Sequence, residues 1–564
     1  MKVNILTKTL SVFAAAAVFT GCIEETYPQG STQREDQVMN SDLALAGMMN
    51  GIPAAMMNTN TANYFSTYGA QSDFGMPAIH IATESMLEDL AIQTSSAGYY
   101  QFYPYAYNLG MGNNMWPIAY FWDCYYTWIK SVNSVINMID ANTENEQYKY
   151  YLGQAYAYRA AFYLDLARMY EPKDAYKVDV TNIKELTVPI VDEKTTEEMA
   201  RNNPRAKRAD LYQFILGDLS SAEKYLKDAA FIYSAPSLAA VYGLYARTYL
   251  EMGYWKDGGD QEAFKNAYDY ADKAIAASGC TPLTQSQWED PATGFNSGSS
   301  NKAWIWGLLV SAEQTGNMTT FIAHMSGECV WGYGLQYTHP GASKLFYDKI
   351  REGDFRRHSW YNKDEAEKYT YKLAGNAETQ AAFKEIAAGY PNMAIKFRPV
   401  LGEVINYTVG GPADHPMMRV EEMEFIKMEA KAYSDWNAAA DLLNNFMNNY
   451  RMMDGAEKYD CKQKIEGNDV YVPVTDLNTF IDEMFFQKRV EFWGEGILFF
   501  DYKRLGKGIT RKYTGSNHPE IWQFNTNGQR SPQWNFVISQ VGEMSSNIGI
   551  TDATNNPDPS GLLE

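Results

Sequence analysis

The chain has 564 residues, which is enough for one large core or for two domains. Its formal net charge of −20 argues against a nucleic-acid-binding protein, because such proteins obtain most of their affinity from Lys and Arg on phosphate. The same charge suits a secreted protein that must stay in solution.

The N-terminus has the pattern of a signal peptide. Lys2 and Lys8 precede an apolar run at 10–20, which is too short to span a bilayer, and small residues then lead into Cys22. This is the pattern of a bacterial lipoprotein signal, so we expect removal of 1–21, acylation of Cys22 and a tether at 22–40. More than one acyl chain makes a stable anchor. An ordinary secretory signal with a chance cysteine is the alternative.

Helical periodicity comes in pairs along the rest of the chain. Helices are predicted at 121–142, 146–170, 208–229, 237–255, 261–278, 418–434, 437–452 and 476–495. The pair at 237–255 and 261–278 resembles the tetratricopeptide pattern, with a longer connecting loop than its repeat allows. We therefore predict a mainly α fold of tetratricopeptide-type helix pairs with long irregular loops.

Two Gly- and aromatic-rich tracts, 53–118 and 280–415, interrupt the helices. A helical scaffold with such loops usually carries its binding function in them. We place an N-terminal helical part at 41–279 and a C-terminal part at 280–564. The 42 Tyr and 13 Trp residues offer flat apolar faces with polar edges, which suit stacking on sugar rings as well as packing between helices.

No catalytic signature is present in the sequence. The G-x-S-x-G, HExxH and P-loop patterns are absent, and all six histidines are isolated. Beyond Cys22, the cysteines are Cys124, Cys280, Cys329 and Cys461. None forms a CxxC pair, so we expect small buried hydrophobes, with a disulfide left open. We predict no catalytic residue, no metal and no cofactor. A glycoside hydrolase remains possible, because its two carboxylates cannot be located from sequence.

Several blocks in the expected order resemble one family. They are QAYAYRAAFYLDLARMY (154–170), LTVPIV (186–191), NNPRAKRADLYQFILGDLSSAEKYL (202–226), MRVEEMEFIKMEAKAY (418–433), RVEFWGEGILFFDYKRLG (489–506) and the tail VISQVGEMSSN (537–547). Together they resemble the SusD/RagB family of outer-membrane glycan-binding lipoproteins, the partners of SusC-type TonB-dependent transporters. Leu498, Glu171 and Ser539 depart from the family pattern.

The resemblance implies a lipid-anchored protein that faces the cell exterior. It would bind a polysaccharide or oligosaccharide and pass it to a SusC-like transporter without catalysing a reaction. Acylated Cys22 would hold it in the outer membrane, and nucleic acid would not be a partner. Since the family also includes peptide importers, a peptide-capturing role is an alternative.

The block at 489–506 is interpreted as structural. We expect a partly buried ionic network of Lys488, Arg489, Glu491, Glu495, Asp501 and Arg504, with Phe492, Trp493, Phe499 and Phe500 packing the scaffold. Gly496 is predicted to end the preceding helix in the left-handed conformation that Gly adopts cheaply.

Family members present ligand-binding aromatics from the loop before the first long helix and from the mid-chain insertion. Here these are 95–114 and 327–341, and the predicted glycan-binding residues are Tyr99, Tyr100, Tyr103, Asn108, Asn113, Trp331, Tyr333 and Tyr337. Tyr100 and Trp331 are the best single candidates, because flanking glycines let a Tyr or Trp stand clear of the backbone. Alternatively, the alternating tyrosines of 99–107 form a strand-like segment with one face buried.

Overall fold

The computed structural model describes residues 42–57, 72–94, 102, 111–113, 115–314, 319–465 and 470–562. The chain divides into two compact units, residues 1–47 and 48–564. Everything below concerns the second unit, apart from the bounds of the first helix.

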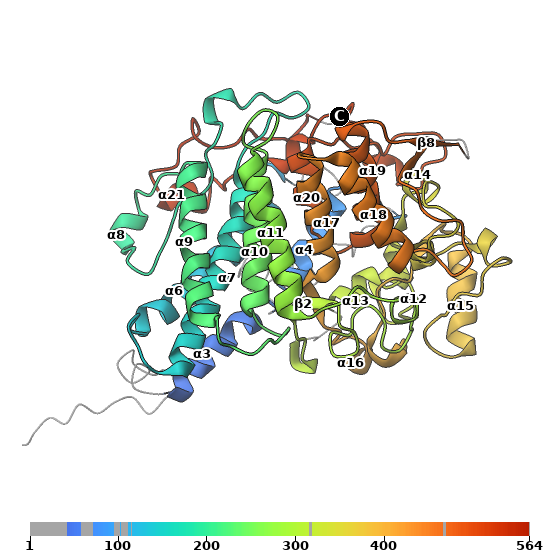
Figure 1. The fold of residues 1–564 in the computed structure, drawn as a ribbon, viewed down its shortest axis with the longest axis horizontal. Coiled ribbons are helices and arrows are strands. Elements are labelled where there is room, and N and C mark those ends of the chain that lie inside the picture. Colours follow the sequence, from blue (N-terminus) through green and yellow to red (C-terminus); the bar gives the residue numbers. More distant parts are fainter. Residues whose placement is uncertain are drawn as a thin grey trace, which may run out of the picture. The chain divides into compact units, whose positions relative to one another are not determined.

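The described chain is mainly helical, as predicted (Figure 1). The longer helices are α3 (Asp42–Ala55), α4 (Met76–Ser85), α6 (Trp116–Met138), α7 (Glu146–Tyr170), α9 (Arg208–Leu226), α10 (Leu238–Gly253), α11 (Gln261–Ser278), α15 (Ala377–Ala387), α17 (Val420–Ala432), α18 (Trp436–Tyr450), α19 (Leu477–Phe492) and α20 (Leu498–Leu505). The short helices are α8 (Glu197–Ala200), α12 (Gln285–Trp288), α13 (Phe321–Met325), α14 (Lys344–Tyr347), α16 (Tyr407–Gly410) and α21 (Glu543–Ser546). In the described residues, no helix combines the length and the apolar character needed to cross a membrane.

The helices predicted at 146–170 and 261–278 have those bounds, and both start at a side-chain cap. Asn145 accepts hydrogen bonds from the first backbone N–H groups of α7, and Asp260 does the same for α11. Gly279, with φ of 62°, ends α11 in the left-handed conformation. The helix predicted at 121–142 begins earlier, at Trp116, because Pro117 fits the first helical turn.

Glycines allow the neighbouring helices of each pair to approach closely. A Cβ on Gly153 of α7 would lie 2.6 Å from the side chain of Leu226, at the end of α9. A Cβ on Gly253 of α10 would lie 2.3 Å from the ring of Phe264 on α11. In Figure 1, α7, α9, α10 and α11 accordingly lie alongside one another, and α17 packs next to α11.

The strands are few and short. A four-stranded sheet in the order β1-β3-β5-β4 consists of β1 (Leu90–Ala91), β3 (Gly341–Ala342), β5 (Met393–Ala394) and β4 (Trp360–Tyr361). The other pairs are antiparallel: β2 (Trp304–Leu308) with β6 (His415–Arg419), and β7 (Lys462–Lys464) with β8 (Tyr471–Pro473). The β2–β6 pair sets Trp304 opposite Arg419 and Leu308 opposite His415, so β6 delivers two polar side chains into the core.

Helix α4 lies in a tract that we predicted to be irregular. All ten of its residues are buried, so its apolar residues form no single stripe, and the periodicity that signals a surface helix is missing. Helix α20, within the 489–506 block, was also not predicted.

The C-terminal segment returns to α7. Asn556 Nδ2 donates to the carbonyl oxygens of Tyr170 (2.9 Å) and Phe536 (2.7 Å). The buried guanidinium of Arg205 donates to five acceptors, at Tyr170, Leu186, Thr187, Thr554 and Asn556. None of these acceptors is a carboxylate, and burial lowers the pKa of Arg205 to about 10.

Candidate functional site

The charged residues of the 489–506 block are buried and paired, which supports the structural interpretation. At their centre, Glu491 accepts from Arg356 (3.1 Å), Arg419 (3.1 Å) and Arg451 (2.7 Å), and all four side chains are at most 1% exposed. Burial by itself would raise the pKa of Glu491, but the three guanidinium groups hold it well below its usual range. Beside it, Glu495 pairs with Lys396 (2.8 Å) and Arg419 (2.9 Å).

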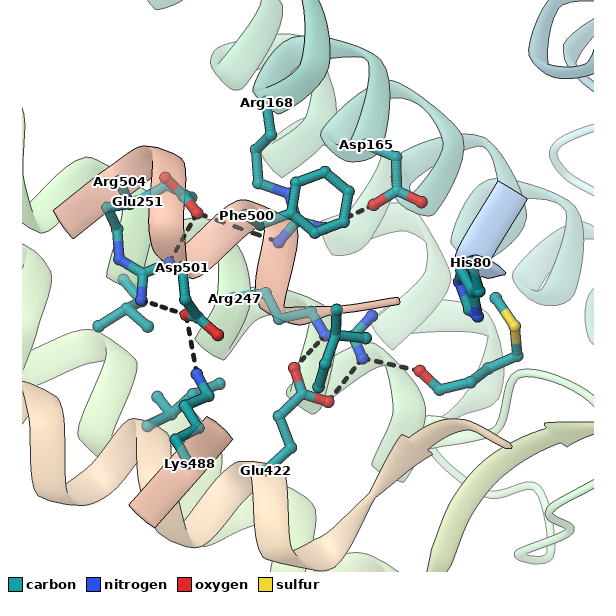
Figure 2. A pocket seen from close by; sticks show the side chains of 14 residues that line it. His80, Asp165, Arg168, Arg247, Glu251, Glu422, Lys488, Phe500, Asp501 and Arg504 are labelled. Atoms are coloured by element: carbon teal, nitrogen blue, oxygen red, sulfur yellow. Dashed lines mark hydrogen bonds and ion pairs between the residues drawn. The ribbon is translucent and has the colours of Figure 1, made fainter. Parts of the chain in front are cut away.

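A second group of charges surrounds Asp501 (Figure 2). Asp501 accepts from Lys488 (2.9 Å) and Arg504 (2.5 Å), and Arg504 also pairs with Glu429 (2.8 Å) and Glu251 (3.0 Å). Figure 2 shows the side chains of Lys488, Asp501, Arg504 and Glu251 converging from α19, α20 and a neighbouring helix on one cavity.

That cavity is not a ligand site. Its volume is about 30 Å³, enough for one or two water molecules. Its lining is balanced in charge, with four carboxylates (Asp165, Glu251, Glu422 and Asp501) and four cations (Arg168, Arg247, Lys488 and Arg504). A charge-balanced space of this size leaves no room for a sugar.

Arg489 belongs to a third group. Its guanidinium donates to Asp89 Oδ2 (2.7 Å) and to Glu88 Oε1 (2.8 Å), both just after α4. We predicted that the six charged residues of the block belong to one network. The structure shows that this prediction is wrong about which residues pair with which. The charges are buried, but they are split into separate groups, and most of their partners come from distant parts of the sequence.

The predicted role of Gly496 is also wrong. Helix α19 ends at Phe492, and Gly494 is the first residue after it with positive φ, at 80°. Gly496, with φ of 77°, lies in the turn before α20, where a Cβ would come within 2.4 Å of His80. The turn needs glycine at this position for the close approach of α4.

The predicted ligand loops are only partly described. Tyr99, Tyr100, Tyr103 and Asn108 lie outside the described residues, and Cys22 does as well. Asn113 is described, and its backbone N–H donates to Asp558 Oδ2 (3.1 Å) in the C-terminal segment. Cys124, Cys280, Cys329 and Cys461 are all buried and free, as expected of small hydrophobes.

The structure brings the two predicted loops together through buried rings. Phe102, in the first loop, packs edge-on against His324 with ring centroids 5.1 Å apart. His324 in turn stacks on Tyr333 of the second loop at 4.9 Å. Tyr333 is 4% exposed, so it supports the loop from beneath and does not present a face to a ligand, contrary to the prediction.

The side chains of Trp331 and Tyr337 are more accessible to a ligand than that of Tyr333. Tyr337 is 43% exposed, and Trp331 is half-buried with its ring 6.4 Å from that of Tyr407. Tyr407 starts the short helix α16 and was not predicted. The backbone N–H of Val330 donates to the carbonyl of Val404 (3.0 Å), which joins the two segments beside these rings.

The segment around Tyr407 carries the densest group of exposed apolar side chains in the described part of the insertion. Leu401, Ile405, Tyr407 and Val409 are exposed by 70%, 57%, 40% and 40%. We call these four residues together with Trp331 the Trp331–Tyr407 surface. The sequence feature that could have indicated this surface is a run of large apolar residues between glycines (VLGEVINYTVGG). The run has neither helical nor strand periodicity.

The backbone of this surface is fixed from within. Glu403 accepts hydrogen bonds from the N–H groups of Ile405 (2.7 Å) and Asn406 (2.9 Å), and these bonds lower its pKa. Asn406 caps α16 by accepting from Thr408. A Cβ on Gly410 would lie 2.0 Å from the carbonyl oxygen of Glu403, so the tight turn requires glycine. The result is a pre-formed surface that exposes aromatic and aliphatic faces.

Such a surface offers rings on which a sugar can stack. Exposed rings stack on the C–H faces of sugars. Glu403 is the carboxylate of segment 401–409, and its oxygen is engaged by its own backbone. In the described parts of the chain, no three His, Cys, Asp or Glu side chains are grouped so that they could hold a metal ion.

Comparison with known proteins agrees with this fold. Residues 33–250 match the SusD-like family described as "Starch-binding associating with outer membrane". No curated protein has a detectably similar sequence. A SusD-like carbohydrate binding protein from Bacteroides vulgatus is 21% identical, with a TM-score of 0.66 over 90% of this chain and 97% of that one.

Two structures from Bacteroides thetaiotaomicron are also similar. A SusD superfamily protein is 17% identical, with a TM-score of 0.61 over 93% of this chain and 100% of that one. Surface glycan-binding protein A in complex with laminarihexaose is 16% identical, with a TM-score of 0.60 over 91% and 99%. The family match over 33–250 and the fold shared over most of the chain with SusD-like proteins agree with the resemblance seen in the sequence.

Proposed function

We propose that this protein is a glycan-binding lipoprotein of the outer-membrane surface that captures a polysaccharide or oligosaccharide and delivers it to a SusC-like TonB-dependent transporter. The observation that carries the proposal is the Trp331–Tyr407 surface, which presents an exposed ring and a half-buried ring from two neighbouring segments of a SusD-like fold. The family description names starch binding, and one of the similar structures holds laminarihexaose. Both support a carbohydrate ligand for this chain.

Binding on such a surface is expected to be weak. An aromatic contact adds roughly 0.5–1.5 kcal/mol beyond the area that it buries. A few such contacts on an open surface correspond to a dissociation constant on the order of micromolar to millimolar. Weak binding suits a capture protein, because its cargo must leave for the transporter.

We infer that the protein binds without turnover. One group of eight charged side chains surrounds a cavity of about 30 Å³, which is too small for a sugar. Glu403, the carboxylate of segment 401–409, holds its own loop together. A surface glycoside hydrolase is the alternative, and turnover of labelled glycans by the pure protein would establish it.

Calorimetry against a broad glycan panel tests the binding site. Trp331→Ala and Tyr407→Ala should each weaken glycan binding at least several-fold while thermal stability stays unchanged, because both rings are partly exposed. Tyr450→Ala, on α18 and 38% exposed, is the matched control and should bind like the wild type. Unaltered binding in both variants would place the site elsewhere, and binding of peptides but no glycan would favour the peptide-capturing alternative.

A further inference from the structure

The segments that form the candidate site carry no positive charge. Residues 35–129, 303–343 and 399–418 contain neither Lys nor Arg, although the chain has 48 such residues. These stretches include both predicted ligand loops and the whole 401–409 segment. The lack of Lys and Arg is read from the amino-acid sequence, so it applies to every residue of the three stretches.

Described residues of the three stretches, all within the second unit, are joined by hydrogen bonds. Val330 and Val404 are joined by a backbone hydrogen bond of 3.0 Å. Gln93 Nε2 donates to the carbonyl of His339 (3.1 Å), and β1 pairs with β3. Trp331 and Tyr407 therefore lie on two cation-free segments that are hydrogen-bonded to each other beside the rings, and the third stretch contacts the end of 327–341.

The cations that flank the 399–418 stretch are buried and occupied. Arg398 is 4% exposed and pairs with Glu328, and it also donates to the carbonyl of Lys372 (2.8 Å). Arg419, at 1% exposed, is held by Glu491 and Glu495 in the buried centre. Neither guanidinium is available to a ligand at the surface.

The fixed charge at the site is negative. Glu403 lies between Leu401 and Ile405, and the two backbone N–H groups that it accepts favour its ionised form. The whole chain adds a net charge of −20, which repels anions at long range.

From this distribution of charge we infer that the site takes neutral glycans and discriminates against glycans that carry uronate or sulfate groups. The inference rests on the proposed function and narrows its substrate class. Recognition of a sugar carboxylate or sulfate uses charge-assisted hydrogen bonds from Arg or Lys. Without them, an anionic group that loses water at the surface is left unpaired, which is unfavourable.

Matched polymers test this inference. Soluble neutral glucans, mannans and galactans are compared by calorimetry with their C6-oxidised counterparts, in which the hydroxymethyl group has become a carboxylate on the same backbone. Alginate, pectate and hyaluronan serve as natural anionic probes. At low ionic strength, we expect the neutral polymer to bind at least ten-fold more tightly than its oxidised form. The difference should narrow at roughly 0.15 M salt, where charges are screened beyond about 8 Å.

A charge-removing variant separates the local effect from the net charge of the chain. Glu403→Gln keeps an oxygen for the two N–H groups and should narrow the neutral-to-oxidised difference in affinity several-fold. Glu262→Gln, exposed on α11, is the control and should leave the difference as it is. Equal or tighter binding of the anionic polymers at low salt would overturn the inference while the proposed function stands. Failure of every glycan to bind would overturn both.

Discussion

Replacing Glu491 with Gln tests whether the buried ionic centre stabilises the fold. The centre holds four cations (Lys396, Arg356, Arg419 and Arg451) and four carboxylates (Asp354, Glu421, Glu491 and Glu495). Glu491→Gln keeps the shape of the side chain but leaves one uncompensated positive charge in a region that excludes water. Removing one partner of a buried ion pair costs about 3–5 kcal/mol.

The expected change in melting temperature follows from the size of the unit. Unfolding entropy of about 2 cal/mol/K per residue gives roughly 1 kcal/mol/K for a unit of this length, so the loss corresponds to a fall of about 3–5 °C. Calorimetry measures the fall in melting temperature, and urea denaturation measures the loss of free energy of unfolding. Glu198→Gln, on an exposed position of α8, should stay within about 0.5 kcal/mol of the wild type.

The pH dependence of stability gives a second test of the role of Glu491. Because the folded pKa of Glu491 lies below its unfolded value, the stability that it contributes is present above the unfolded pKa of about 4.3 and is lost only as the pH falls through the folded pKa. The difference between wild type and variant should therefore be the same at pH 8 and pH 5.5. A variant as stable as the wild type, or one that loses only ligand binding, would refute the reasoning.

Two further predictions concern single residues. Burial of Asp123 and the nearby Glu543 carboxylate raise the pKa of Asp123 to about 7. Because the pKa of Asp123 is raised in the folded state, the stability of the wild type falls as the pH rises through 7. Asp123→Asn should therefore be more stable than the wild type at pH 8, by about 1 kcal/mol for this half-buried group. At pH 5 the variant should not be more stable than the wild type. Urea midpoints of wild type and variant at both pH values measure this difference in stability. The same difference at pH 5 and at pH 8 would contradict the prediction. Cys22→Ala should block lipidation and leave the protein out of the outer-membrane fraction; an acylated, membrane-bound variant would exclude Cys22 as the anchor.

Local signals predicted much of the helical scaffold. Helices α7 and α11 have polar caps and a clear change of periodicity at their ends, and their predicted bounds are confirmed. Helix α4 has no such contrast, because every side of it is buried. A sequence pattern reports a helix well only when one face of the helix meets water.

Partners across the fold could not be predicted. The sequence marks Glu491 as a charge among aromatic residues, but Arg356, Arg419 and Arg451 reach it from three separate elements. The same holds at the candidate site. Gly-flanked Trp331 was identified from its own segment, whereas Tyr407 becomes relevant only once Val330 and Val404 are paired. Tyr333 is buried, and neighbouring aromatics in a loop sequence do not reveal which one faces inward.

The contacts of Arg205 have a consequence for the order in which the chain folds. Two of its five acceptors, at Thr554 and Asn556, lie 349 and 351 residues further along the chain. Until they arrive, this cation lacks part of its hydrogen bonding, and the end of α7 lacks the amide of Asn556. The hydrogen bonds around the end of α7 are therefore complete only when the segment that holds Thr554 and Asn556 has been made and has returned to this helix.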